Sequence, residues 1–467
     1  MYLYTYVIMN FTEVFRMNII IVGCGKVGGA LASQLNNEGH NVTVIDQNAD
    51  KVKAIANKLD IMGVIGNGAS RTIQKEAGID DTDLLIAVTG NDELNLLSCL
   101  VAKKSAGCRT IARLRNPEYN MDALYFKNEL GLAMVINPEL ATAREITRIL
   151  NFPSALKIDT FAKGRVDLLT FKLPENSRLA GMSVKEVATK LKTNVTFCTV
   201  EREDDAYIAN GNFVFAERDV ISIIASPKGA KDFFAKINYK IQPIKDALIV
   251  GGGAITHYLC ELLEKSGIDV KVIEKNTERA VELAEEFDKA TVINGDPTDE
   301  DILREEGIGS ASSFIAMTGL DEENILLSLF AKRQGSRKVI TNVNRIEYDD
   351  ITNQLDLDCV IHPKNIAAEI IVSYVRGMSN AGSSNIETLY HLSRGKVEAA
   401  EFTVLEGSPI IGTPLMQLDF KPGVLVAMIQ RGRTQITPRG QDIIEAGDSV
   451  VIVTKGIALN DITDILK

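Results

Sequence analysis

The chain has 467 residues, of which 45% are hydrophobic and 24% are charged. This composition is typical of soluble globular proteins, and the length suits roughly two to four domains. The formal net charge of −11 at pH 7 argues against nucleic-acid binding, which needs a basic surface. The six cysteines form no C-x-x-C pair, and we interpret them as reduced, apolar residues of a cytoplasmic protein.

Residues 1–16 form an N-terminal extension ahead of the first predicted strand. Tyr2–Phe11 is apolar but shorter than the roughly 18–20 residues that span a bilayer. It has neither a basic leader nor a small-residue cleavage site, so we do not expect a signal peptide. We interpret the extension as an upstream start or a disordered tail, with a short surface anchor as the alternative.

Strand and helix patterns alternate over residues 17–150. Apolar runs predict strands at 18–22, 42–46, 61–65, 84–88, 110–113 and 133–136. Helical patterns lie at Val27–Asn37, Asn48–Leu59, Ser70–Ala77, Asp92–Ala106 and Pro138–Leu150. Such alternation predicts βαβ units and a parallel, doubly wound sheet, so we expect a Rossmann-like N-lobe of the α/β class here.

A glycine-rich loop follows the first predicted strand. Gly23, Gly25 and Gly28 fit a dinucleotide-binding turn: they permit a sharp turn, close approach of a pyrophosphate, and close packing of the next helix. The N-terminus of that helix adds free N–H groups and partial positive charge. Asp46 ends the second strand, where a carboxylate accepts hydrogen bonds from ribose hydroxyls and repels a 2′-phosphate, which favours NAD(H) over NADP(H).

Further candidate contacts lie at strand ends, the edge at which this fold binds ligands. Asn67 would meet the adenine edge, Thr89 and Gly90 follow the fourth strand, and Arg113 would neutralise phosphate charge. These residue types are also common in turns and helix caps. A purely local role is therefore the alternative for each.

Residues 158–240 follow a different pattern. Strands near 168–171, 195–200 and 220–224 and a short helix near Ser183–Leu191 predict a small α+β C-lobe. We expect linkers at Asn151–Lys157 and Asp232–Lys245.

The whole arrangement is then repeated. Gly251 corresponds to Gly23, and Glu274 corresponds to Asp46, each at an offset of 228 residues. Ala316–Glu322 matches Ala87–Glu93 at an offset of 229. We therefore expect a second Rossmann-like N-lobe over 246–376 and a second C-lobe over 387–467. A linker rich in Ser, Asn and Gly is expected at Gly377–Ile386.

The second turn departs from the first. Thr256 replaces Gly28, and its branched side chain should push the helix slightly away from the strand. Asn342 replaces Arg113, which removes a cation. The second lobe is therefore either a structural copy that binds weakly or not at all, or a second site with altered preference.

These motifs, together with Ile111–Tyr119 (IARLRNPEY) and the two C-lobes, resemble the RCK (KTN) regulators of potassium conductance. With both units on one chain, the sequence resembles the cytoplasmic regulatory component of Trk-type potassium uptake systems. The resemblance implies N-lobes that bind NAD(H), ATP and ADP, and copies that assemble as a homotetrameric ring. It also implies docking on the inner face of the cell membrane, against a membrane-embedded, potassium-translocating Trk subunit.

The resemblance also implies which residues bind the nucleotide. The first site would comprise Gly23, Cys24, Gly25, Lys26, Val27, Gly28, Asp46, Asn67, Thr89, Gly90 and Arg113. The second would comprise Gly251, Gly252, Gly253, Ala254, Ile255, Glu274, Asp296, Thr318 and Asn342.

An NAD-dependent oxidoreductase is the alternative function. Hydride transfer needs a proton donor or acceptor near the reacting carbon. Of the four histidines only His362 is suitably placed, and its counterpart in the first half is Asn137. No Tyr-x-x-x-Lys pair or metal-ligand cluster accompanies either turn, so we expect neither catalysis nor a metal; a scaffold with vestigial sites is the third possibility.

Overall fold

The computed structural model of the protein describes residues 16–467 apart from a few short gaps. The gaps are residues 154, 156, 163, 164, 176, 204, 238, 240–242, 345–354, 356, 381–385, 394, 395, 433, 458 and 460. The predicted N-terminal extension therefore lies outside the described residues, except for Arg16. The chain divides into two compact units, one of residues 1–136 with 370–384 and one of residues 137–369 with 385–467.

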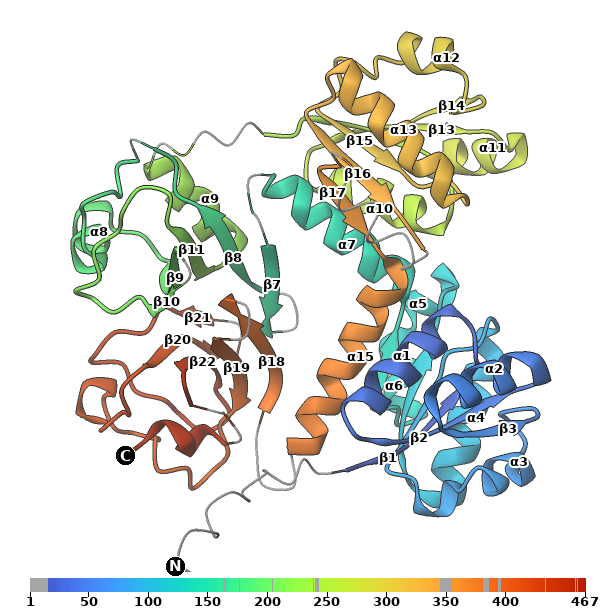
Figure 1. Cartoon of the computed structure of the whole chain (residues 1–467), viewed down its shortest axis with the longest axis horizontal. Coiled ribbons are helices and arrows are strands. Elements are labelled where there is room, and N and C mark those ends of the chain that lie inside the picture. The colour runs from blue at the N-terminus through green and yellow to red at the C-terminus, as the bar shows by residue number, and fades with distance from the viewer. Residues whose placement is uncertain are drawn as a thin grey trace, which may run out of the picture. The chain divides into compact units, whose positions relative to one another are not determined.

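The first N-lobe is a six-stranded parallel sheet of order β3-β2-β1-β4-β5-β6 (Figure 1). Its strands are β1 (Asn18–Val22), β2 (Asn41–Asp46), β3 (Met62–Ile65), β4 (Leu84–Ala87), β5 (Arg109–Arg113) and β6 (Met134–Ile136). Its helices are α1 (Lys26–Asn37), α2 (Ala49–Leu59), α3 (Arg71–Glu76), η1 (Ile79–Asp81), α4 (Asp92–Ala106), α5 (Pro117–Met121) and α6 (Ala123–Glu129). The strand order reverses between β1 and β4, where this fold binds ligands.

The second N-lobe repeats this sheet, with the order β14-β13-β12-β15-β16-β17. Its strands are β12 (Asp246–Val250), β13 (Asp269–Glu274), β14 (Thr291–Asn294), β15 (Ser313–Ala316), β16 (Lys338–Asn342) and β17 (Cys359–Ile361). Its helices are α10 (Ala254–Lys265), α11 (Thr277–Glu286), α12 (Glu300–Glu305) and α13 (Asp321–Gln334). The two predicted Rossmann-like lobes are confirmed.

The helix that follows the last strand of the first N-lobe packs on the second N-lobe. Asn137 accepts the Leu140 amide at 2.8 Å and starts α7 (Pro138–Asn151). The apolar face of α7, which includes Ile146, lies in one core cluster with Leu259 of α10. Asn137 also donates to the Tyr258 hydroxyl at 2.9 Å. Sequence order alone therefore does not tell which lobe a helix covers.

The helix that follows the last strand of the second N-lobe is divided between the two units. α15 (Pro363–Asn380) begins in the second unit, and its residues from Ile370 onward belong to the first. There Arg376 Nη2 lies 2.6 Å from Glu38 Oε1. Because α15 runs to Asn380, the predicted linker at Gly377–Ile386 is wrong over its first four residues.

Each C-lobe contains a five-stranded antiparallel sheet. The first has the order β10-β9-β11-β8-β7 and the second β18-β19-β22-β20-β21. The first lobe comprises β7 (Lys157–Phe161), β8 (Val166–Lys172), α8 (Val184–Leu191), β9 (Thr196–Arg202), β10 (Asp205–Ile208), β11 (Val220–Ala225) and α9 (Pro227–Lys236). The second comprises β18 (Ile386–Leu392), β19 (Val397–Thr403), η5 (Leu415–Gln417), β20 (Val424–Arg431), β21 (Thr434–Ile436), β22 (Ser449–Lys455) and η6 (Ile462–Ile465).

Two linkers predicted around the first C-lobe overlap regular structure. α9 extends to Lys236, inside the predicted linker Asp232–Lys245, and β7 begins at Lys157, the last residue of the predicted linker Asn151–Lys157. The short strand β10 was not predicted either. It has only four residues, Asp-Ala-Tyr-Ile, which is too short a run to give a clear apolar pattern.

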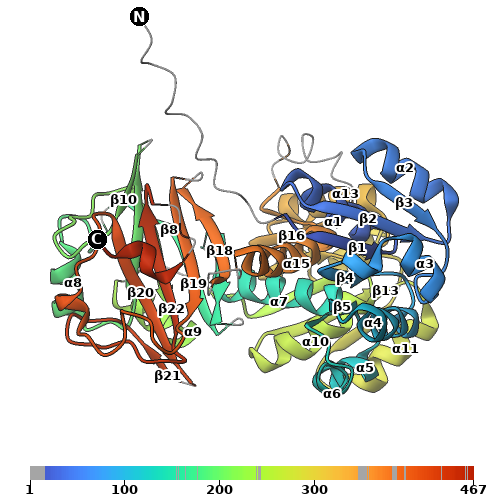
Figure 2. The same ribbon diagram turned by 90° about the horizontal axis from the view of Figure 1, so that it is seen from below.

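The two C-lobe sheets pack against each other through a shared apolar core (Figure 2). Phe161 of β7 meets Tyr390 of β18 edge to face, with ring centroids 5.1 Å apart. The buried Glu401 accepts the Ala162 amide at 3.0 Å, which ties the second sheet to the turn after β7. Apolar contacts and one buried hydrogen-bond acceptor therefore hold the two sheets against each other.

One arginine–aspartate pair occurs in both C-lobes. Arg202 donates through Nε and Nη2 to Asp219 at 2.8 and 2.9 Å. Arg431 makes the same two contacts with Asp448 at 3.0 and 2.8 Å. Both aspartates are buried, and this bidentate geometry is the strong form of the ion pair. The repeat is therefore preserved at the level of single hydrogen bonds.

Candidate functional site

The first glycine turn has the geometry that a phosphate-binding loop needs. Gly23 has a φ of +110°, and a Cβ there would lie 2.9 Å from the amide nitrogen of Thr89. A Cβ at Gly28 would lie 1.8 Å from the carbonyl oxygen of Gly23, so α1 packs directly on the turn. Gly25 instead faces open space, with nothing within 4 Å of a Cβ. Two glycines are therefore required by the fold, and the third leaves room for a ligand.

The carboxylate that ends β2 is tied to the turn. Asp46 Oδ2 accepts the Cys24 amide at 2.7 Å, and Oδ1 accepts the Asn48 amide at 2.9 Å. Each carboxylate oxygen can accept a second hydrogen bond, so Asp46 retains acceptor capacity for ribose hydroxyls. Burial and the charge of Asp46 raise the pKa of the Cys24 thiol to about 12, so this thiol stays neutral and is no nucleophile.

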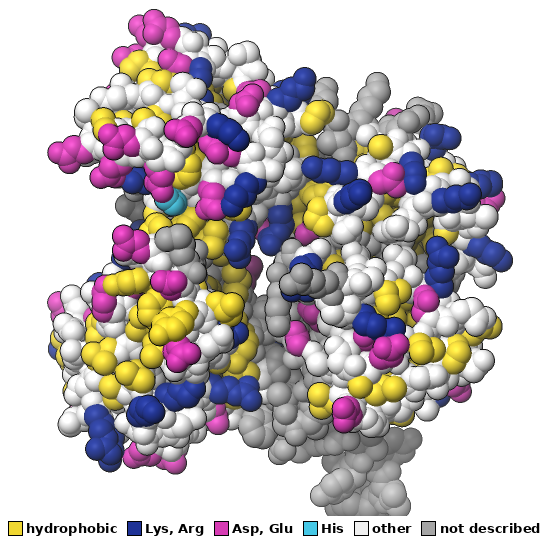
Figure 3. Space-filling model, turned by 180° about the vertical axis from the view of Figure 1, so that it is seen from behind, with side chains coloured by type: hydrophobic (Ala, Val, Ile, Leu, Met, Phe, Trp, Pro, Cys, Tyr) yellow, Lys and Arg dark blue, Asp and Glu magenta, His cyan; other side chains and the backbone are white. Residues whose placement is uncertain are grey.

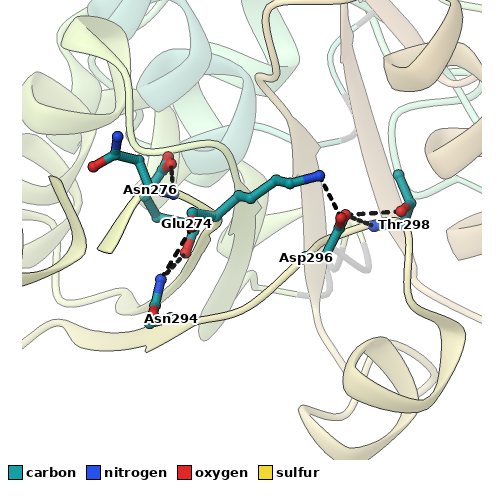
Figure 4. Close-up of polar contacts among 6 residues, drawn as sticks. Glu274, Asn276, Asn294, Asp296 and Thr298 are labelled. Carbon is teal, nitrogen blue, oxygen red and sulfur yellow. Dashed lines mark hydrogen bonds and ion pairs between the residues drawn. The ribbon is translucent and has the colours of Figure 1, made fainter. Parts of the chain in front are cut away.

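The second turn reproduces this arrangement with different residues. Gly251 has a φ of +98°, and Gly253 faces open space. The Gly252 amide donates to Oε2 of Glu274. The Asn276 amide donates to Oε1 of the same side chain at 2.6 Å (Figure 4). The longer glutamate thus takes the two contacts that Asp46 makes in the first lobe.

Thr256 attaches its helix to the turn by a hydrogen bond. Its hydroxyl donates to the Gly251 carbonyl at 2.5 Å, and the side chain is buried. A Cβ at the corresponding Gly28 would lie 1.8 Å from the carbonyl oxygen of Gly23, so the backbone of the first turn could not accept a threonine there without moving. The hydrogen bond from Thr256 was not predicted from the sequence.

A buried asparagine joins the ends of the fourth and fifth strands in each N-lobe. Asn95 accepts the Thr89 amide at 2.8 Å and donates to the Arg113 carbonyl at 2.9 Å. Asn324 makes the same contacts with Thr318, at 2.8 Å, and with Asn342, at 2.9 Å. Sequence reasoning missed both asparagines. Their recurrence at equivalent positions of the two repeats was the available signal.

The candidates in the loop after the third strand differ between the lobes. Asn67 is exposed and caps its own turn, accepting the Ala69 amide at 2.9 Å. Asp296 accepts the Thr298 amide at 3.0 Å and pairs with Lys275 Nζ at 2.5 Å. The hydrogen bond from Lys275 lowers the pKa of Asp296 to about 2, so this carboxylate is ionised. The turn-capping role is present in both lobes, but the second loop adds charge.

The first lobe carries more positive charge where its fifth strand ends. Arg115 lies two residues beyond Arg113 and donates to the Gly90 carbonyl at 2.6 Å. Sequence reasoning did not select Arg115. In the second lobe Asn342 and Asn344 occupy these positions, and acidic side chains gather over that lobe in Figure 3. The first lobe is thus the better match for a polyphosphate.

The predicted residues of each site lie at one edge of one sheet. In the first lobe the turn contacts Thr89, Asp46 binds the turn, and the loop after β3 is joined to Asp46 by the Gly66 amide at 3.0 Å. In the second, Gly295 donates to the Glu274 carbonyl at 3.0 Å. Both sets therefore converge as a nucleotide-binding edge requires.

Three of the histidines make local contacts. His40 accepts the Met17 amide at 3.3 Å, His257 lies 3.0 Å from Glu286, and His362 lies 2.8 Å from the Val343 carbonyl. Within the described residues, no group of three or more His, Cys, Asp or Glu side chains is arranged to hold a metal ion.

Among the helices of the described residues, none is both long and apolar enough to cross a membrane.

Sequence profiles of two domain families match the chain twice each. The TrkA-N domain matches residues 19–138 and 247–363, and the TrkA-C domain matches residues 168–238 and 399–467. The two repeats found by offset are thus two copies of the same domain pair.

Curated relatives match over almost the full length. "Trk system potassium uptake protein TrkA homolog 1" of Methanosarcina mazei is 32% identical over 97% of this chain and 100% of its own. "Trk system potassium uptake protein TrkA" of Halomonas elongata is 30% identical over 93% of this chain and 95% of its own.

Solved structures share the fold at lower identity. The GsuK RCK domain superposes with a TM-score of 0.61 at 18% identity, over 94% of this chain and 93% of its own. The GsuK channel bound to NAD superposes with a TM-score of 0.62 at 16% identity, over 94% of this chain and 77% of its own. On the matched domains and full-length relatives, the chain belongs to the TrkA family, with two TrkA-N and TrkA-C domain pairs of the RCK fold.

Proposed function

We propose that this chain is the nucleotide-sensing regulatory subunit of a potassium uptake system. One observation carries the proposal: in both N-lobes a turn amide donates to the carboxylate that ends the second strand, beside a glycine that faces open space. The names of the relatives, which are potassium uptake proteins, support the role in transport. GsuK structures described as bound to NAD and to ADP support nucleotides as the ligands.

The residues of the first lobe fit a dinucleotide or an adenine nucleotide. Gly25 and the N-terminus of the 12-residue helix α1 would receive the phosphates. Asp46 would accept the ribose hydroxyls, and Arg113 would lie near phosphate charge. NAD(H) supplies no chemistry in this role: its binding energy would favour one conformation of the lobes.

Copies of the chain would assemble as a homotetrameric ring. Leu97 on α4 and Leu326 on α13 occupy equivalent positions of the two repeats, yet they are 50% and 67% exposed. Leu124 and Tyr125 of α6 add exposed apolar area to the first lobe, and hydrophobic side chains gather on one face of this lobe in Figure 3. A repeated apolar position on both lobes suits contacts between copies.

The ring would act from the cytoplasmic side, peripheral to the membrane, on a potassium-translocating subunit of Trk type. Each chain in the ring would contribute two N-lobes, 17–150 and 246–376, and two C-lobes, 158–240 and 387–467. Coupling between such sites is typically about 1–3 kcal/mol, which changes partner activity roughly 5- to 150-fold.

Calorimetry of nucleotide binding tests the proposal. Gly25→Asp and Gly253→Asp each place a carboxylate in open space at extended backbone, so both variants should fold. Gly211→Asp is the matched control, because it makes the same change in open space in the first C-lobe. NADH, ADP or ATP should bind the wild type and the control, and Gly25→Asp should abolish the tighter site. Equal binding by all four proteins, or turnover of a metabolite with NAD, would contradict the proposal.

A further inference from the structure

A polar cleft lies between the two C-lobes. Its volume is about 600 Å³, within the range of sites that bind small organic molecules. Both lobes belong to the same compact unit, and their sheets share an apolar core. The residues that bring a charge or an amide to the cleft are Arg165 and Asn194 of the first lobe and Gln430, Gln435, Arg439 and Asp442 of the second. The cleft is therefore separate from both glycine turns.

At the position that the repeat relates to this cleft, a lysine side chain fills the interface. An offset of 229 residues relates Ser226 to Lys455 and Tyr207 to Ile436. Lys455 donates from Nζ to a backbone carbonyl of β10 at 2.5 Å and lies 5.5 Å from the centroid of the Tyr207 ring. Ser226 lines the cleft but is too short to reach the partner lobe, and its hydroxyl accepts the Gly229 amide at 3.1 Å. The chain thus closes one half of the C-lobe interface with its own cation and leaves the other half open.

Two arginine side chains line the cleft without an acidic partner. Nη1 of Arg165 lies 3.3 Å from the carbonyl oxygen of Gly432, and both arginines are exposed. Within the described residues neither guanidinium makes an ion pair, and the Arg439 side chain makes no hydrogen bond. A guanidinium is a planar donor that matches a carboxylate or a phosphate through two parallel hydrogen bonds. Two such groups at one cleft indicate a ligand with two anionic groups.

A carboxylate at the same cleft restricts the charge of that ligand. Oδ2 of Asp442 accepts the Arg439 amide at 2.6 Å, and Oδ1 accepts no hydrogen bond in the part of the chain that the structure describes. The buried Gln430 donates from Nε2 to the Gly432 carbonyl at 3.0 Å, so its oxygen also keeps acceptor capacity. The lining therefore combines two cations with one anion and an oriented amide. This set complements two carboxylates and one ammonium group, whereas a phosphate ester brings no cation for Asp442.

We propose that this cleft binds an acidic amino acid, such as glutamate or aspartate. Its two carboxylates pair with Arg165 and Arg439, and its ammonium group donates to Asp442 and Gln430. The single net negative charge of the ligand balances the single net positive charge of the lining. The inference goes beyond nucleotide sensing, because it gives the chain an effector site in its C-lobes. A ligand bound between the lobes would favour one arrangement of the C-lobe pair.

Calorimetry of the full chain with L-glutamate and L-aspartate tests the site. At least one of the two should bind the wild type, and Arg439→Gln should weaken that binding roughly 10- to 150-fold, the range for losing one charged hydrogen-bonding partner. Arg439 is exposed and its side chain has no partner within the described residues, so the variant should fold. Arg71→Gln is the matched control, because it removes an exposed arginine from α3 of the first N-lobe. It should leave binding unchanged.

The ammonium contact is tested with glutarate and succinate, which keep both carboxylates of glutamate and aspartate but lack the ammonium group. The wild type should bind the amino acid roughly 10- to 150-fold more tightly than the matching diacid. Asp442→Asn should remove most of this preference. Because the asparagine oxygen can still accept the Arg439 amide, the turn should be kept.

Four results would overturn the inference. They are no binding of either amino acid, unchanged binding by Arg439→Gln, diacids that bind as tightly as the amino acids, and inorganic phosphate that displaces the amino acid at similar concentrations. Phosphate should fail to compete, because it offers Asp442 no cation. None of these measurements includes a nucleotide, so their outcome and the outcome for the proposed function are independent.

Discussion

The Cys24 amide donates to the Oδ2 atom of Asp46 at 2.7 Å, so the glycine turn and the acid at the end of β2 form one unit. The second lobe keeps the unit by changing both partners together. There the acid is the longer Glu274, and the turn residue is Gly252, where a Cβ would lie 2.8 Å from Oε2 of that glutamate. Each change makes room for the other.

Gly252→Ala should therefore destabilise the protein through a clash that depends on Glu274. Inserting a methyl group against this carboxylate and the buried Leu283 should cost about 1–3 kcal/mol. Glu274→Asp should recover part of that loss, and a double-mutant cycle from urea unfolding would measure the coupling. Strictly additive effects of the two changes would show that the residues do not interact.

The repeated arginine–aspartate pair should matter far more to stability than a surface pair. Asp448→Asn removes the charge from a carboxylate that accepts two bonds from Arg431 and the Glu445 amide. It should lower the free energy of unfolding by about 1.5–3 kcal/mol. Glu300→Gln breaks the exposed pair with Arg304 on α12 and should cost less than ~0.5 kcal/mol. Urea unfolding compares them, and equal losses would refute this ranking.

The stability of the protein should depend on the protonation of Asp167 in β8. Burial raises the pKa of this carboxyl to about 6, although the nearby Arg148 lowers it. The folded state thus binds the proton more tightly than the unfolded state. The penalty for ionisation is absent below pH ~4, grows as the pH rises, and is complete above pH ~6.

Asp167→Asn should accordingly stabilise the protein at pH 7.5 by up to ~3 kcal/mol and leave it nearly unchanged at pH 4. Thermal unfolding of the wild type and the variant across this range measures the difference. A variant that is less stable than the wild type at pH 7.5 would show that the charge of Asp167 contributes favourably.

Assembly should depend on the exposed leucines of α4 and α13. Leu97→Asp and Leu326→Asp each place a charge on a side chain that is at least half exposed, so the variants should fold. The added charge should weaken apolar contacts between copies of the chain. Sedimentation should show a tetramer for the wild type and smaller species for the variants. Val281→Asp is the control, since Val281 is 50% exposed on α11. A wild type that stays monomeric would contradict the ring.

Strand positions were predictable because local apolar runs determine them. The predicted first strand, 18–22, coincides with β1, and the offset of 228 between the two glycine turns also relates β1 to β12 and β2 to β13. Both the acid at the end of β2 and its counterpart Glu274 were found in this way, since the distance from glycine to acid is a property of one βαβ unit.

Contacts between segments far apart in the chain could not be predicted from the sequence. Nothing local in Pro138–Asn151 says that this helix packs on α10, because its apolar stripe would suit any sheet or helix. The role of Asn95 was equally hidden, since a polar residue in a helix is usually exposed. The hydrogen bond from Thr256 to Gly251 was also missed, because the branched side chain indicated only that the helix is pushed away and not that its hydroxyl reaches the turn.

We propose above all that nucleotide bound at the first glycine turn controls potassium uptake. The most direct measurement is rubidium uptake into cells that lack their own potassium uptake systems and express this chain with its membrane partner. The wild type and Gly211→Asp should support uptake that responds to the cellular nucleotide pool, and Gly25→Asp should change it roughly 5- to 150-fold. Identical uptake with Gly25→Asp, Gly211→Asp and the wild type would contradict the claim.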